Sequence, residues 1–81
     1  MSTTVVKRSV VVGGHRTSVS LENAFWDALH ALAARQGKTI NQVVSDIDAA
    51  RQGNLSSAIR VWVLDCAREG LLPLRKPPTE R

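Results

Sequence analysis

The stretch Arg16-Thr17-Ser18-Val19-Ser20-Leu21 constrains the fold most, because it alternates polar and apolar residues and then passes directly into a helical pattern at Leu21-Glu22. Alternation with a period of two is typical of a strand that buries one face. Such a strand leaves backbone groups unpaired along its edges, and an unpaired edge invites another strand to pair with it. The simplest expectation is the same strand from a second copy, which gives an intermolecular two-stranded antiparallel β-ribbon.

The alternation also divides the side chains of that ribbon between two faces. Thr17, Val19 and Leu21 are expected to face the helices, so that the outward row is Arg16, Ser18 and Ser20. The major groove of DNA admits a two-stranded ribbon, and short polar and cationic side chains suit its floor. The strand therefore favours a DNA-binding function.

The residues before this strand leave two arrangements open. Gly13-Gly14 offers a two-residue hairpin turn, since both glycines tolerate positive φ. Val5–Val12 could then pair with His15–Ser20 within one chain. Because the valine-rich segment does not alternate cleanly, we favour an extended arm with a glycine break. The two arrangements could also coexist, with the arm adding outer strands to a central intermolecular ribbon. The expected domains are a basic arm over residues 1–14, a folded domain over 15–70 and a flexible basic, proline-containing tail over 71–81.

Three helices are expected after the strand. The first runs from about Glu22 to Gln36, with Ser20 or its neighbour as the cap. Thr39 and Gln42 form a capping box for the second helix, and Asn54 caps the third. Helical spacing predicts these buried stripes: Leu21, Phe25, Ala28, Leu29 and Leu32; Ile40, Val43, Val44 and Ile47; Leu55, Ala58, Ile59, Trp62, Val63 and Cys66. The third stripe is broad enough for a helix that crosses a dimer axis.

Charge and composition exclude several classes of function. The chain has 81 residues and a net charge of +4, and its excess cations lie in the N-terminal arm and the C-terminal tail, as expected of an edge that binds a polyanion. There is no apolar run of about 18–20 residues, no signal-peptide layout and one cysteine, so we expect a cytoplasmic protein without a membrane span. His30 has no metal-ligating company, and Ser56-Ser57 has no base placed to activate it. We therefore expect no metal, no cofactor and no enzymatic activity.

Several segments together resemble the ribbon-helix-helix DNA-binding proteins. Gly14-His15-Arg16-Thr17-Ser18-Val19-Ser20-Leu21-Glu22, Phe25-Trp26, Ile47-Asp48 and Leu55-Ser56-Ser57-Ala58-Ile59-Arg60 look like a group of short bacterial proteins of that fold. The resemblance covers roughly residues 7–68. It implies a mainly α fold with one short strand region and an obligate dimer. The third helix is a departure, because the general family usually ends with its second helix.

The resemblance also implies roles for particular residues. By position, Arg16, Ser18 and Ser20 would read bases, and backbone N–H groups near Thr39, Ile40 and Asn41 would hold a phosphate. Gly53-Asn54-Leu55-Ser56-Ser57 resembles the same helix start in the family, so the phosphate clamp has two candidate places. The full set of candidate DNA-binding residues is Lys7, Arg8, His15, Arg16, Ser18, Ser20, Lys38, Thr39 and Asn41.

Two functions follow from this interpretation. The first is a dimeric, sequence-dependent regulator of transcription that binds double-stranded DNA in the nucleoid, represses by occupying an operator, and could pair into tetramers on DNA. The alternative is an antitoxin-like module that presents its third helix and C-terminal tail to a protein partner. Serines make weaker base contacts than Arg, Asn or Gln, so DNA shape would contribute to specificity.

Overall fold

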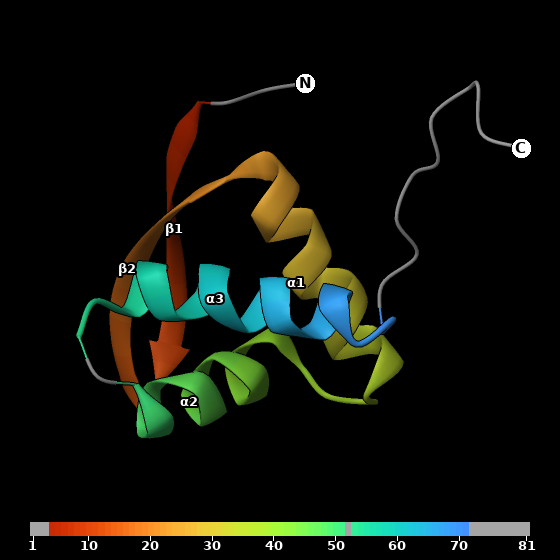
Figure 1. Cartoon of the computed structure of the whole chain (residues 1–81). Coiled ribbons are helices and arrows are strands. Elements are labelled where there is room, and N and C mark those ends of the chain that lie inside the picture. The colour runs from red at the N-terminus through yellow and green to blue at the C-terminus, as the bar shows by residue number, and fades with distance from the viewer. Residues whose placement is uncertain (1–3, 52, 72–81) are drawn as a thin grey trace, which may run out of the picture.

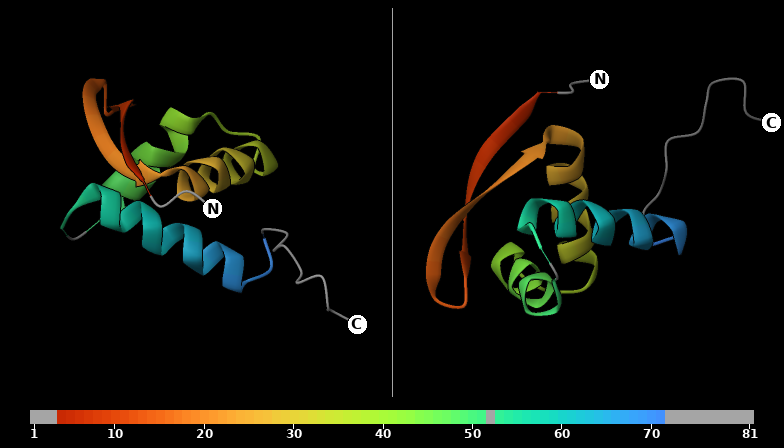
Figure 2. Two further views of the ribbon diagram at one scale, coloured as in Figure 1. Left: turned by 90° about the horizontal axis from the view of Figure 1, so that it is seen from above. Right: turned by 60° about the vertical axis from the view of Figure 1, so that its left-hand side comes forward.

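A β-hairpin followed by three helices makes up this protein, in a computed structural model that describes residues 4–51 and 53–71 (Figure 1). The elements are β1 (Val5–Val12), β2 (His15–Glu22), α1 (Asn23–Arg35), α2 (Ile40–Ala50) and α3 (Leu55–Arg68). The hairpin stands on one side of the helices, with its turn toward α2 (Figure 2). The expected three helices are confirmed, and the residues expected to form the tail after Leu71 lie outside the described part of the chain.

The hairpin forms within one chain, so the extended arm that we favoured from the sequence is wrong. β1 pairs antiparallel with β2 from Val5↔Glu22 to Val12↔His15. Gly13 and Gly14 adopt φ values of 57° and 80°, as a two-residue turn with a twist suited to a hairpin requires. The prediction was wrong because it required clean alternation of polar and apolar residues in Val5–Val12. A strand with valines on both faces can still pair through its backbone, and β-branched residues favour the strand conformation.

Alternation along the strands gives the hairpin an inner and an outer face. Val10, Val19 and Leu21 on the inner face are buried against the helices. Thr17 lies on the same face by alternation but is exposed, contrary to the expectation that it would be covered. The reason is that α3 meets β2 at Ser20, closer to the C-terminal end of the strand.

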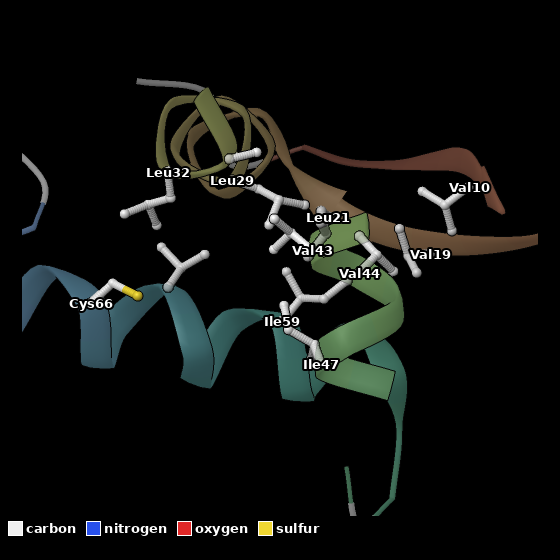
Figure 3. Close-up of a cluster of buried hydrophobic side chains, with 12 residues drawn as sticks. Val10, Val19, Leu21, Leu29, Leu32, Val43, Val44, Ile47, Ile59 and Cys66 are labelled. Carbon is white, nitrogen blue, oxygen red and sulfur yellow. The ribbon is translucent and has the colours of Figure 1, made fainter. Parts of the chain in front are cut away.

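The hydrophobic core lies between the inner face of the hairpin and all three helices (Figure 3). Leu21, Leu29, Leu32, Val44 and Ile59 are completely buried. Each fully buried aliphatic side chain contributes about 1.5–3 kcal/mol relative to an exposed one, so the core fixes the hairpin to the helices. Cys66 is also buried, and desolvation, followed by the nearby charges of Glu69 and Asp65, raises the pKa of its thiol. A reactive thiolate is therefore disfavoured there.

The helix starts agree with the sequence in two cases out of three. The capping box is present, with the Gln42 N–H donating to Thr39 Oγ1 at 3.1 Å and the Thr39 N–H donating to Gln42 Oε1 at 2.8 Å. Asn54 caps α3 by accepting from the Ser57 N–H at 3.0 Å. The predicted Ser20 cap of α1 is wrong, because Glu22 is the N-cap residue and makes no side-chain cap bond.

Among the described helices, none combines the length and the apolar character that crossing a bilayer would need.

Candidate nucleic-acid interface

The outer face of the hairpin gathers the polar and cationic side chains of both strands. Three cross-strand pairs line it from base to turn: Lys7↔Ser20, Ser9↔Ser18 and Val11↔Arg16. All of these residues are exposed except Ser20, which is half-buried. The face is a continuous row that carries two cations, and the buried residues of the hairpin lie on its opposite side.

Glu22 is the acidic residue at the base of the same face, and its charge is compensated. Its Oε1 accepts a hydrogen bond from Arg60 Nε at 3.0 Å, and both side chains are partly exposed. A hydrogen bond from its own backbone N–H, followed by the bond from Arg60, lowers the pKa of the Glu22 carboxyl. The carboxylate therefore stays ionised and paired, and it subtracts little from the positive potential nearer the turn.

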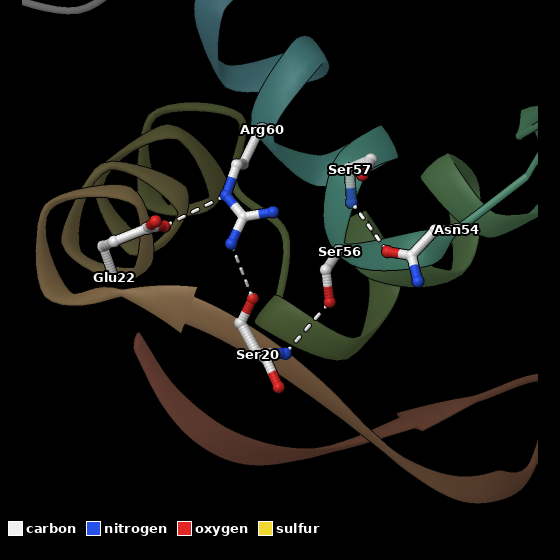
Figure 4. Close-up of polar contacts among 6 residues, drawn as sticks. All are labelled: Ser20, Glu22, Asn54, Ser56, Ser57 and Arg60. Carbon is white, nitrogen blue, oxygen red and sulfur yellow. Dashed lines mark hydrogen bonds and ion pairs between the residues drawn. The ribbon is translucent and has the colours of Figure 1, made fainter. Parts of the chain in front are cut away.

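The start of α3 closes the free edge of β2 at Ser20 (Figure 4). The Ser20 N–H donates to Ser56 Oγ at 2.9 Å, and the Ser20 carbonyl accepts from Arg60 Nη2 at 3.1 Å. One guanidinium thus joins the backbone of β2 to the Glu22 carboxylate. The third helix is held beside the ribbon by its first two turns.

The start of α2 closes the free edge of β1 near the turn. The Val11 N–H donates to Asn41 Oδ1 at 3.0 Å. Lys38, just before the helix, forms an exposed ion pair with Asp46, with 2.9 Å between Nζ and Oδ2. The first N–H groups of a helix have no intrahelical acceptor, so those of Ile40 and Asn41 are available to an anion beside the ribbon tip.

The two possible phosphate clamps therefore flank opposite edges of the ribbon. The α2 start lies at the β1 edge close to the turn, and the α3 start lies at the β2 edge closer to the base. In α3 the backbone N–H groups of Ser57 and Ala58 are bonded to Asn54, which leaves the first two of the helix. Both sequence candidates are adjacent to the outer face.

The structure brings together only some of the residues singled out from the sequence. Lys7, Arg16 and Ser18 share the exposed outer face, and His15 is exposed beside the turn. Arg8 points the other way. Its guanidinium carbon lies 5.0 Å from the ring centroid of Trp26, and its Nη2 donates to Asn23 Oδ1.

Ser9 and Val11 complete the outer face and were missed from the sequence. Their positions follow from the register, in which each lies directly opposite a residue already singled out, Ser18 and Arg16. The Gly13-Gly14 turn was the signal, since a two-residue hairpin turn fixes which residues pair. Taking the hairpin alternative would have found both.

A second surface lies on the far side of α3. Val61 and Leu64 are 57% and 53% exposed, which is unusual for large aliphatic side chains. Beside them is a groove of about 470 Å³ between the end of α2 and α3, with Ile47, Ala50, Ala58, Val61 and Trp62 among its lining residues. No cluster of three or more potential metal ligands occurs within residues 4–51 and 53–71.

Comparison with known proteins places these features in a family. A family model described as a ribbon-helix-helix domain matches residues 5–67, which includes the hairpin and nearly all of α3. Among solved structures, an uncharacterized protein from Bordetella pertussis Tohama I is similar, with a TM-score of 0.67 and 31% sequence identity. That match covers 94% of this chain and 69% of the other. A search of curated proteins found no match.

Proposed function

This chain belongs to the ribbon-helix-helix domain family, and from that premise we propose that it is a transcriptional regulator that inserts its β-hairpin into the major groove of DNA. The family as a whole consists of DNA-binding regulators and related antitoxins. The proposed regulator acts as a homodimer and represses by occupying an operator.

The observation that carries the proposal is the outer face of the hairpin. Lys7, Arg16 and Ser18 are exposed there on two paired strands, a ribbon of the width that the major groove admits. The buried apolar side chains of the hairpin, Val10, Val19 and Leu21, lie on the inner face in the core and so do not obstruct insertion. A helix start lies beside each edge of the ribbon, and this supports backbone N–H contacts to the phosphates that border the groove.

The second copy in the proposed dimer would dock on α3. Val61 and Leu64 are apolar and exposed next to the groove, and exposed apolar patches of this kind mark interaction sites. In a dimer bound to an operator, two hairpins contact the same DNA. Binding of the second hairpin is then intramolecular, so the dimer binds more tightly than either hairpin alone.

The direct test measures binding of a selected DNA duplex by fluorescence anisotropy. Arg16→Ala is expected to weaken binding by about 1–3 kcal/mol, because it removes a base or phosphate contact together with positive charge. Unchanged affinity for a tightly bound duplex would refute the proposal.

Salt dependence provides a matched pair of variants. Lys7→Ala is expected to reduce the slope of log affinity against log salt by about 0.9, the value for one lost phosphate contact. Arg8→Ala removes the neighbouring cation, but Arg8 is turned inward over Trp26, so the slope should change less. Equal slopes for the two variants would contradict the assignment of Lys7 to the interface.

The exposed face of α3 also supports a second candidate, an antitoxin-like module that binds a protein partner there. Purification from the native host discriminates between the two. Retention of DNA by the wild type, lost in Arg16→Ala, supports the regulator. One stoichiometric protein that is lost from Val61→Asp, with no DNA retained, supports the module.

A further inference from the structure

The two strands of this ribbon differ in sequence, so its outer face has no two-fold symmetry. A ribbon made from the same strand of two copies repeats every side chain about its axis. Here β1 supplies Lys7, Ser9 and Val11, whereas β2 supplies the serines and Arg16. The end near the turn therefore differs chemically from the base.

Val11 and Arg16 distinguish the end near the turn. They lie directly opposite each other, Val11 is 39% exposed, and Arg16 is exposed. The Val11 N–H points away from β2 to Asn41, so this is a pair without mutual hydrogen bonds. Side chains approach most closely in such pairs, with Cβ atoms about 4.5–5.5 Å apart.

The chemistry of this pair matches two features of the major groove. An apolar side chain contacts the C5-methyl group of thymine, and an arginine donates two hydrogen bonds to O6 and N7 of guanine. Base pairs are stacked about 3.4 Å apart, so side chains this close reach the same or neighbouring pairs. The bond to Asn41 holds the backbone of Val11 in place beside the start of α2.

Resting on the proposed function, we propose that each chain by itself reads an asymmetric DNA element, with a thymine methyl against Val11 and a guanine on a neighbouring base pair against Arg16. A dimer then recognises two such elements as a separated repeat. An intermolecular ribbon would instead place a symmetry axis within the base pairs that it contacts. The intrachain ribbon therefore requires an asymmetric DNA element, whereas the intermolecular ribbon requires a two-fold symmetric one.

The first experiment selects duplexes from a pool with a randomised centre, using the full chain at low salt. An enriched element that contains adjacent T and G and lacks internal two-fold symmetry is expected. An element with a symmetry axis through its contacted base pairs would overturn this inference and leave the proposed function standing. No enrichment of any sequence would overturn the proposed function, and the inference with it.

The second experiment changes one chemical group on a base of the enriched duplex. Replacing the thymine by deoxyuridine removes one methyl group and should weaken binding about fourfold, the factor for one buried methyl contact. Val11→Ala should bind both duplexes equally. Val6→Ala, the same change at an exposed valine on the opposite face of β1, should keep the fourfold difference.

The guanine contact has a corresponding test. Replacing guanine by 7-deazaguanine removes the N7 acceptor and should weaken binding at least about fivefold in the wild type, while Arg16→Ala should not distinguish the two duplexes. Equal loss in the wild type and in the matching variant, for either base, would overturn the inference.

Discussion

Ser56 and Ser57 are adjacent serines in the first turn of α3, and replacing each with alanine should change stability in opposite directions. Ser56 Oγ accepts the Ser20 N–H at 2.9 Å, which joins α3 to the edge of β2. Ser57 is exposed, and its hydroxyl makes no hydrogen bond within the described residues. The two substitutions remove the same atom from the same turn, so the difference between them isolates the bond to β2.

The magnitude follows from two terms. Loss of the Ser56 hydroxyl leaves a half-buried N–H without its acceptor, which costs about 1–1.5 kcal/mol because water reaches that edge only in part. Alanine exceeds serine in helix propensity by up to roughly 0.5 kcal/mol, which opposes the loss in Ser56→Ala and acts alone in Ser57→Ala. Ser56→Ala should therefore destabilise by about 0.5–1.5 kcal/mol and Ser57→Ala should stabilise by a few tenths.

Urea unfolding followed by circular dichroism measures both variants. The midpoint should fall for Ser56→Ala and rise slightly for Ser57→Ala, at an unchanged slope. The Ser20 amide should also exchange its proton faster in Ser56→Ala alone. Equal shifts of the midpoint in the two variants would refute the conclusion that Ser56 holds α3 to the ribbon.

Two further predictions test the ribbon and its base. The double variant Ser9→Cys, Ser18→Cys places two thiols directly opposite each other on the outer face. Under oxidation they should form a disulfide within one chain. A dimeric band on a non-reducing gel would contradict the intrachain hairpin. Glu22 has a lowered pKa, so its ionised form stabilises the fold at neutral pH, and this contribution is lost as the pH falls through that lowered pKa. The difference in unfolding free energy between wild type and Glu22→Gln should therefore be largest at neutral pH and shrink as the pH falls below the ordinary range of a glutamate carboxyl, whereas a difference independent of pH would contradict the pairing with Arg60.

Local signals in the sequence predicted the helical part of this fold well. The capping box of Thr39 and Gln42 and the Asn54 cap are each formed by residues three apart, so spacing alone reveals them. The buried positions of α2 and α3, such as Val43, Val44 and Ile59, follow from helical periodicity. These features depend on neighbours along the chain, which the sequence displays directly.

Long-range contacts could not be predicted in the same way. Ser20 was expected to cap α1, but its N–H finds Ser56, 36 residues later. Arg8 was expected to face DNA as Lys7 does, but one position along a strand reverses the face, and Trp26 accepts its guanidinium. The second error traces to the pairing of β1, because the register decides which cation of Lys7-Arg8 points outward.

The hydrogen bonds at the edges of the hairpin limit where a further strand could pair with it. N–H and C=O directions alternate along a strand, so the bonds at Val11 and Ser20 identify the outward-facing groups as those of every second residue. Within the described residues, no protein partner bonds to the outward backbone N–H and C=O groups of Lys7 and Ser9 on the β1 edge. The same holds for those of Arg16 and Ser18 on the β2 edge. A further strand would meet Asn41 near the turn on the first edge, and Ser56 with Arg60 toward the base on the second. These bonds leave residues 5–10 of β1 and 15–19 of β2 open to pairing, so a further strand on either edge could be no longer than about the usual five or six residues. Since the major groove admits two strands, the side chains that hold the helices to the hairpin also restrict the pairing that would make it too wide to enter.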